Sequence, residues 1–390
     1  MPPYAVYLHI PFCVHRCGYC DFNTYAGLDE LIPAYTAALR REIALVGQAA
    51  GERLPVHTIF FGGGTPSLLS GAQLEAILHS LEDAFDWQPG IEITLEANPG
   101  TVSLASLREM RRLGLNRLSL GMQSAHPGEL RLLERQHDYP EVTRAVAAAR
   151  RAGFDNLNLD LIFGLPEQEL STWQNSLELA LGLHPEHLSL YALTLEHGTP
   201  LKRWASRGLI PEPDPDLAAE MYEWADGRLA AAGYEQYEIS NWSIAQQPCR
   251  HNLQYWRGLP YLGLGAGAHG YAAGVRTANV LAPAAYIARL DNSSAHEFPR
   301  TLATASLTPV DRQAEIGETM MMGLRLTQEG VSEADFQARF GQSLEALFAS
   351  EIKELQGYGL LEWVGETPQR RLRLTSRGRL LGNQVFMRFI

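Results

Sequence analysis

The stretch Tyr7-Leu-His-Ile-Pro-Phe-Cys13-Val-His-Arg-Cys17-Gly-Tyr-Cys20 places three cysteines on one short loop, directly after an apolar run at residues 4–10. Structural zinc sites and passive electron-transfer clusters normally take four protein ligands. A site with three thiolates leaves one metal position for another molecule. The spacing of three residues and then two therefore predicts an iron site with an open position, and a zinc site or a chance group of core thiols is the alternative.

Short apolar runs alternate with helical patterns through the first half of the chain. Strands are predicted at residues 4–10, 58–62, 92–97, 117–121, 157–162 and 187–191. Helices are predicted between them, at residues 31–49, 71–85, 104–113, 140–152 and 172–183. A repeat of strand and helix indicates an α/β protein with parallel strands. Six such units are fewer than the eight of a closed barrel.

The carboxyl ends of the predicted strands carry the polar residues that a functional rim requires. In chain order these are the cysteine loop, Gly62-Gly63-Gly64-Thr65-Pro66, Glu96, Gln123 and Asp160. Glycines let the backbone approach a ligand and present its N–H groups, although an ordinary turn is the alternative. Glu96 ends an apolar strand, where a carboxylate needs a cation or hydroxyl donors as partners.

The cysteine loop resembles that of the radical S-adenosylmethionine (SAM) superfamily, whose members bind a [4Fe-4S] cluster through three cysteines and SAM at the fourth iron. This resemblance implies an open, partial (β/α)6 barrel. Several motifs narrow it to the oxygen-independent coproporphyrinogen III dehydrogenase (oxidase) family, over most of the chain. These motifs are Tyr7-x-His-Ile-Pro-Phe-Cys13, Gly62-Gly-Gly-Thr-Pro66, Glu96-Ala-Asn-Pro99, Ser119-Leu-Gly-Met-Gln123, Arg135-Gln-His137 and Asn158-Leu-Asp-Leu-Ile-Phe-Gly-Leu-Pro166.

The resemblance implies that Cys13, Cys17 and Cys20 hold the [4Fe-4S] cluster. It also implies a set of SAM contacts, namely Tyr7, Tyr19, Gly63, Gly64, Thr65, Glu96, Gln123, Arg135 and Asp160. In that family these positions serve two SAM molecules, so a second SAM site here is an implication only. For Arg135 a surface position near Glu134 is the alternative, and Asp160 could instead be an internal hydrogen-bond acceptor.

Two features set the chain apart from the dehydrogenase. Only twelve residues precede Cys13, so we expect the longer amino-terminal segment that covers the substrate to be missing, and Asp21-Phe22 stands where the enzyme has a further cysteine. In addition, Cys249-Arg-His251-Asn252-Leu-Gln-Tyr255-Trp256 resembles the His-Asn-x-x-Tyr-Trp motif of the haem chaperone branch of the family, HemW.

The haem-chaperone motif has side chains that suit a haem. Imidazole is a common axial ligand of haem iron, so His251 is the predicted ligand, and Asn252 is predicted to orient its ring. Tyr255 and Trp256 offer flat faces to a porphyrin. Cys249 could be a buried thiol, a second haem contact or a fourth cluster ligand.

The remaining sequence indicates three segments, a radical SAM partial barrel at 1–198, a connecting region with the haem motif at 199–305, and a winged-helix-like α+β domain at 306–390. In the last segment helices are predicted at 312–326 and 344–356, and a hairpin near 359–375. We expect the three consecutive methionines at 320–322 to pack in its core. The glycine-rich stretch 258–274 is either a structural meander, which we favour, or a flexible loop near the cofactor.

Composition limits the location and the partners. Four cysteines in 390 residues, three of them needed as thiolates, indicate a reducing, cytoplasmic location, and no signal peptide or membrane span is predicted. A net charge of −12 argues against nucleic acid as a partner. Six arginines after residue 367 form a basic patch, which we interpret as a solvated hairpin, with a peripheral membrane or partner contact as the alternative.

Two functions from different classes follow. The first is a haem chaperone that binds a [4Fe-4S] cluster, SAM and haem, and transfers the haem to acceptor haem proteins at the membrane. The second is a radical SAM decarboxylase of coproporphyrinogen III, which needs an electron donor and several cations for a tetra-acidic substrate. The sequence supplies only scattered arginines near the rim, which favours the chaperone, with a homodimer as a further option.

Overall fold

The computed structural model describes residues 2–292 and 296–390, and the chain divides into two compact units. Unit 1 comprises Met1–Gly227 and Pro260–Thr308, and unit 2 comprises Arg228–Leu259 and Pro309–Ile390. The expected connecting region, 199–305, thus contributes residues to both units.

Unit 1 contains six parallel strands in chain order, as the sequence predicts. They are β1 (Tyr4–Ile10), β4 (Pro55–Gly63), β5 (Asp86–Ala97), β6 (Arg117–Gln123), β7 (Leu157–Phe163) and β8 (His187–Ala192). Every residue of β6 is buried, as is typical of a parallel strand that is covered on both faces. The radical SAM-type partial barrel is confirmed.

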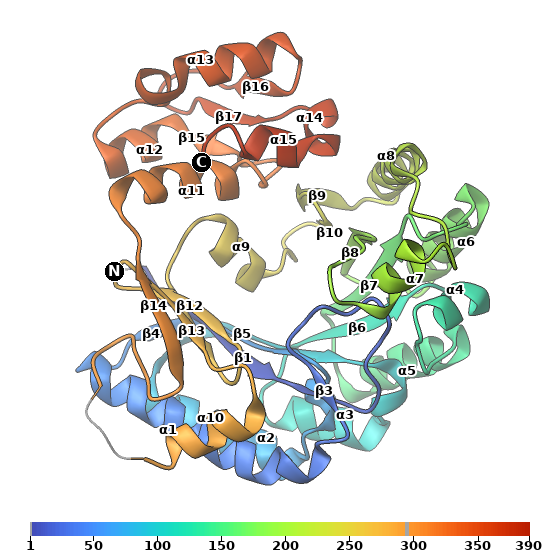
Figure 1. Ribbon diagram of the computed structural model, residues 1–390, viewed down its shortest axis with the longest axis vertical. Helices are drawn as coiled ribbons and strands as arrows, with labels where there is room; N and C mark the ends of the chain where they lie inside the picture. Colours follow the sequence, from blue (N-terminus) through green and yellow to red (C-terminus); the bar gives the residue numbers. More distant parts are fainter. Residues whose placement is uncertain (1, 293–295) are drawn as a thin grey trace. The chain divides into compact units, whose positions relative to one another are not determined.

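Helices connect these strands and begin and end where the local sequence directs. They are α1 (Ile32–Ala50), α2 (Gly71–Ala84), α3 (Leu104–Arg112), α4 (Pro127–Leu132), α5 (Tyr139–Ala152) and α6 (Leu170–Leu181). Two more helices follow β8, namely α7 (Pro200–Ser206) and α8 (Pro215–Ala231), and α8 ends within unit 2. Ser70 and Asp138 form capping boxes at the start of α2 and α5, and Gly51 ends α1 in a left-handed conformation. Figure 1 shows α1, α2 and α3 along one face of the strands.

The sheet continues beyond β1, which the six-unit pattern did not predict. A parallel strand, β11 (Tyr261–Leu264), pairs with β1, and Leu8 lies opposite Leu264. The order then runs through β12 (His269–Ala272), β13 (Val275–Asn279) and β14 (Thr304–Pro309), and α10 (Pro283–Leu290) lies between the last two. The glycine-rich stretch 258–274 is therefore the structural meander that we favoured.

This meander, together with the segment after β13, holds the end of the cysteine loop. The amide of Asn23 donates to the carbonyl oxygens of Ala266 and Leu281, each at 3.0 Å. Nε2 of His9 donates to the carbonyl oxygen of Asn23 at 2.8 Å, so its Nδ1 accepts from the Tyr7 hydroxyl at 3.0 Å. A chain of hydrogen bonds thus connects β1, the cysteine loop and the meander.

One carboxylate fastens the meander to α1. Glu42 accepts hydrogen bonds from the backbone N–H of Gly265 (2.8 Å), the Asn279 amide (2.8 Å), the Tyr286 hydroxyl (2.6 Å) and the Thr301 hydroxyl (2.8 Å). Its side chain is fully buried, so these four donors replace the water that the carboxylate loses on folding.

Unit 2 contains the carboxyl-terminal domain and a short segment that carries the haem motif. Its elements are β9 (Glu235–Glu238), β10 (Asn241–Ser243), α9 (Arg250–Trp256), α11 (Arg312–Gly323), β15 (Val331–Ser332), α12 (Glu333–Phe340), α13 (Leu344–Gly357), β16 (Leu361–Val364), β17 (Arg371–Leu374), α14 (Ser376–Leu380) and α15 (Gly382–Phe386). An antiparallel sheet in the order β15-β17-β16 contains the predicted hairpin.

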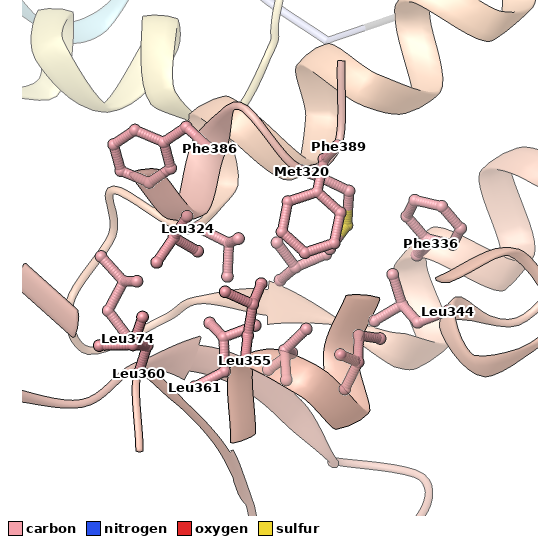
Figure 2. Close-up of a cluster of buried hydrophobic side chains, with 14 of the residues drawn as sticks. Met320, Leu324, Phe336, Leu344, Leu355, Leu360, Leu361, Leu374, Phe386 and Phe389 are labelled. Atoms are coloured by element: carbon pink, nitrogen blue, oxygen red, sulfur yellow. The ribbon is translucent and has the colours of Figure 1, made fainter. Parts of the chain in front are cut away.

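The core of the carboxyl-terminal domain is apolar and packs helices against this sheet. Met320 is fully buried there among Leu324, Phe336, Leu355 and Phe389, as Figure 2 shows. Met321 packs against the same cluster from a partly buried position. The prediction that the methionine run is core packing is confirmed for Met320 and Met321. The winged-helix-like α+β domain is confirmed as well.

Candidate functional site

A cavity of about 440 Å³ opens at the carboxyl ends of the strands of unit 1. Its lining includes nearly all residues predicted for the cluster and SAM, namely Cys13, Cys17, Tyr19, Cys20, Gly63, Gly64, Thr65, Glu96, Gln123, Arg135 and Asp160. Tyr7 does not line the cavity, and its hydroxyl bonds to His9. Arg135 is therefore not the surface arginine that the sequence left open.

The three cysteines are free thiols: Cys13 ends β2 (Phe12–Cys13), and Cys17 and Cys20 lie on the loop between β2 and β3 (Tyr25–Ala26). Burial raises the pKa of Cys13 and of Cys20, so binding of a metal would release their protons. Across residues 2–292 and 296–390, no three His, Cys, Asp or Glu side chains converge tightly enough to hold a single metal ion. A [4Fe-4S] cluster distributes its ligands over different irons, and so suits thiols that are spread around a loop.

Each cysteine sulfur has a polar side chain beside it. The Thr65 hydroxyl donates to Cys13 Sγ at 3.7 Å, and Arg135 Nη1 donates to Cys17 Sγ at 3.5 Å. Cys20 Sγ and the Thr24 hydroxyl lie 3.7 Å apart in a hydrogen bond that either can donate.

The glycine run after β4 leaves no room for side chains. A Cβ on Gly63 would lie 2.6 Å from the His9 ring, and a Cβ on Gly64 would lie 2.6 Å from the Phe12 carbonyl oxygen and 2.9 Å from Cys13 Sγ. Gly63 also has a φ of +113°, and its N–H donates to Glu96 Oε2 at 3.2 Å. The backbone therefore approaches the cysteine loop closely, which only glycine permits here.

Glu96 and Asp160 are two of the carboxyl groups that line the cavity. Burial, followed by the nearby Asp160, raises the pKa of Glu96 to about 8. Burial also raises the pKa of Asp160, against the lowering effect of hydrogen bonds from Ser119 Oγ (2.8 Å) and Asn158 Nδ2 (2.8 Å). A cationic ligand or one rich in hydroxyl groups would stabilise both carboxylates.

Arg135 brings a positive charge to the cavity, which Arg16 also lines. Its Nη2 donates to Asn98 Oδ1 and, at 3.0 Å, to the Gly121 carbonyl oxygen. Its Nε is buried and has no hydrogen-bond partner among the described residues. The preceding residue, Glu134, has a φ of +56°, a left-handed conformation that functional sites often contain. A buried N–H group without a partner points to a bound acceptor, such as a carboxylate.

These residues fit the two groups that the sequence resemblance implies. Three thiols, each beside a polar side chain, suit a cluster, while Glu96, Asp160 and the unpartnered Nε of Arg135 suit the ammonium, hydroxyl and carboxylate groups of SAM.

The structure adds residues that we did not predict as part of the site. Asn98 bonds both Thr65 and Arg135, and Asn158 bonds Ser119, Asp160 and, through Oδ1, His187 Nδ1 at 2.6 Å. A signal for the strand residues was present in the sequence, because successive side chains of a strand alternate between its faces. Polar residues stand at alternate positions, at 158 and 160 of β7, 187 and 189 of β8, and 117, 119 and 123 of β6, where Gly121 interrupts the series.

The haem motif forms helix α9 of unit 2. His251 is only 1% exposed, and its Nε2 hydrogen-bonds with the Tyr255 hydroxyl at 2.8 Å. Asn252 donates to the Tyr237 hydroxyl at 3.4 Å, so its observed partner is not His251, contrary to the orienting role that we expected. The guanidinium of Arg325 lies over the Trp256 ring, 5.1 Å from its centroid. Trp256 Nε1 is buried without a hydrogen-bond partner among the described residues.

Cys249 directly precedes α9, and its side chain is 1% exposed and forms no disulfide. Three of the six arginines of the predicted basic patch form ion pairs. Arg370 forms ion pairs with Glu333 and Glu345, Arg373 with Glu362, and Arg388 with Glu354. Arg371 and Arg373 lie on the hairpin strand β17, but Arg377 and Arg379 lie on α14 and Arg388 follows α15, so a hairpin describes only part of the patch. Within the part of the chain that the structure covers, no helix is both long enough and apolar enough to cross a membrane.

Comparison with known proteins places the chain in a family. A model of the radical SAM superfamily matches residues 7–180, and a model of the HemN C-terminal domain matches residues 310–381. The solved structure of coproporphyrinogen III oxidase (HemN) from Escherichia coli has a TM-score of 0.83, with 24% identity, and covers 99% of this chain and 90% of that one. At this level of sequence identity, the similarity shows that the two proteins share a fold.

Two relatives are similar over nearly their whole length. The heme chaperone HemW of Mycobacterium tuberculosis is 40% identical over 386 residues, which cover 98% of this chain and 94% of that protein. The heme chaperone HemW of Bacillus subtilis is 38% identical over 387 residues, which cover 99% of each protein. The chain therefore belongs to the HemW family of heme chaperones, within the radical SAM superfamily.

Proposed function

We propose that this protein is a haem chaperone that binds a [4Fe-4S] cluster, SAM and haem, and passes the haem to acceptor haem proteins. The observation that carries the proposal is the similarity to heme chaperones over nearly the full length of the chain. The radical SAM family implies the cluster and SAM.

The cavity of unit 1 supports the first two ligands. Cys13, Cys17 and Cys20 would hold the cluster, which leaves one iron for SAM. The proposed SAM contacts are the cavity residues Tyr19, Gly63, Gly64, Thr65, Glu96, Gln123, Arg135 and Asp160. Tyr7 would act through His9 and not by direct contact.

For haem, we propose His251 as the axial ligand, with Tyr255 and Trp256 against the porphyrin. Nε2 of His251 now bonds to the Tyr255 hydroxyl, so this bond must break before iron can bind there. Asn252 would support the helix through Tyr237. We further propose that the protein forms a homodimer in the cytoplasm. If SAM is cleaved, the protein also needs an electron donor as a partner.

An anaerobic haem titration, followed by Soret absorbance, tests the proposal. The proteins are the cluster-loaded wild type, His251→Ala, and His197→Ala as the matched control, because His197 is an exposed histidine of unit 1. We expect saturable one-to-one binding that is at least tenfold weaker in His251→Ala and unchanged in His197→Ala. Equal binding in all three would move the haem site elsewhere.

Absence of specific binding to the wild type would overturn the chaperone proposal. Formation of protoporphyrinogen from coproporphyrinogen III, with SAM and a reductant, would replace it with the decarboxylase. In parallel, Cys17→Ala should abolish the iron–sulfur absorbance after anaerobic reconstitution, and Cys249→Ala should retain it. Loss of absorbance in Cys249→Ala would identify a fourth cluster ligand.

A further inference from the structure

Every cysteine of the proposed cluster site has a separate hydrogen-bonding side chain. Thr65 forms a hydrogen bond with Sγ of Cys13, Arg135 with Sγ of Cys17, and Thr24 with Sγ of Cys20, at donor–acceptor distances of 3.5–3.7 Å. The three come from different parts of unit 1, namely the loop after β4, the segment after α4 and the cysteine loop itself. Thr24 and Thr65 are 4% and 2% exposed, so water does not compete strongly for their hydroxyl groups.

The direction of these hydrogen bonds follows from the chemistry of the sulfur. A cysteine bound to iron is a thiolate, which has no proton and can only accept a hydrogen bond. The bond between Thr24 and Cys20, which either side chain can donate when the thiol is protonated, then has Thr24 as its donor.

Asn98 fixes two of the donors. Its Nδ2 donates to Thr65 Oγ1 at 3.0 Å, which leaves the threonine proton directed to Cys13 Sγ. Its Oδ1 accepts from Nη2 of Arg135, whose Nη1 points to Cys17 Sγ. One amide therefore holds a neutral donor and a charged donor against neighbouring sulfurs.

We propose that Thr24, Thr65 and Arg135 raise the reduction potential of the cluster by each donating a hydrogen bond to one cysteine sulfur. Uptake of an electron adds negative charge to the cluster and its sulfurs, and donors aimed at the sulfurs stabilise the reduced form. Arg135 contributes most, because its donor carries a full positive charge. Asn98 is a positioning residue for both Thr65 and Arg135. The inference rests on the cluster of the proposed function.

A redox titration of the anaerobically reconstituted protein tests this inference. The cluster is reduced by one electron with dithionite in the absence of SAM, and the midpoint potential is read from the electron paramagnetic resonance signal. Thr24→Val keeps the shape of the side chain and removes the donor, whereas Thr24→Ser keeps the hydroxyl and is its matched control. We expect a more negative midpoint potential in Thr24→Val and the wild-type value in Thr24→Ser.

Arg135→Gln should shift the midpoint potential further in the same direction than Thr24→Val does. Equal midpoint potentials in wild type, Thr24→Val and Arg135→Gln, all with full iron and sulfide content, would overturn the inference. If Thr24→Val assembles no cluster, the pair Thr65→Val and Thr65→Ser decides by the same comparison. Iron and sulfide analysis of the wild type comes first, since a wild type that holds no cluster contradicts the proposed cofactor and not the role of the donors.

Discussion

The hydroxyl of Tyr255 forms a hydrogen bond with Nε2 of His251 at 2.8 Å, and the two rings pack edge to face with centroids 5.0 Å apart. The residues are four positions apart on α9, so their side chains lie on the same face of the helix. The nitrogen that would bind iron is therefore engaged within its own helix.

Replacement of Tyr255 by Phe should tighten haem binding at His251. The hydrogen bond that must break contributes about 1 kcal/mol, which corresponds to roughly a fivefold change in the dissociation constant. A Soret titration measures this change, and Tyr255→Phe combined with His251→Ala is the control, because it should bind as weakly as His251→Ala alone. Weaker binding in Tyr255→Phe would mean that the hydroxyl assists haem binding.

The raised pKa of Glu96 makes the stability of the protein depend on pH. The folded protein holds this proton up to about pH 8, whereas an unfolded chain releases it near the ordinary value of 4.5. The free energy of unfolding should therefore fall as the pH rises between these values. Glu96→Gln should match the wild type at pH 5 and exceed it by about 1 kcal/mol or more at pH 8.5. Urea unfolding of both proteins checks this, and a difference that does not change with pH would contradict it.

Because Gly267 lies close to Asn23, we expect a side chain at position 267 to make the cluster less stable. Gly267 and Gly274 have similar backbone conformations, with φ of +77° and +73°. A Cβ on Gly267 would lie 2.3 Å from Asn23 Nδ2, but a Cβ on Gly274 would have no neighbour within 4 Å. Both alanine variants carry the strain of a left-handed residue, about 1 kcal/mol, and only Gly267→Ala displaces Asn23. We expect a chelator to remove iron several-fold faster from Gly267→Ala than from Gly274→Ala. Equal rates would show that Asn23 does not hold the cysteine loop.

Glu42 should be one of the most sensitive positions of unit 1. Glu42→Ala leaves four buried donors without their acceptor. Each unsatisfied group costs about 1–3 kcal/mol, so we expect a loss of about 3 kcal/mol or more in the free energy of unfolding. Exposed Glu30 is the matched control, and Glu30→Ala should change stability by less than about 0.5 kcal/mol. Chemical denaturation measures both, and a small effect at Glu42 would mean that water replaces the carboxylate.

The strands of the barrel and the rim residues could be predicted because they depend on local patterns. Hydrophobic runs indicate β1 and β4 to β8 in order. Parallel strands place functional residues at their carboxyl ends, and Glu96 and Asp160 do line one cavity there. The pairing of Leu8 with Leu264 could not be predicted in this way, because nothing in either segment specifies a partner more than 250 residues away.

The partners of single side chains were equally hard to foresee. The approach of Arg135 to Cys17 and the bond of Asn252 to Tyr237 depend on tertiary packing and not on a repeat. By contrast, the inward-facing polar positions 119, 158 and 187 follow the alternation of their strands and were accessible to sequence reasoning.

The anchors of Asn23 also bear on the order of events during synthesis. Ala266 and Leu281 follow Asn23 by 243 and 258 residues. A ribosome adds roughly 5–20 residues per second, so they emerge on the order of 10 s or more after the three cysteines. Until then, the thiols are on a nascent chain whose loop lacks these two hydrogen bonds, although His9 can already bind the Asn23 carbonyl oxygen. We therefore expect iron to be inserted only after residue 281 has been translated, as a late step in the biogenesis of the protein.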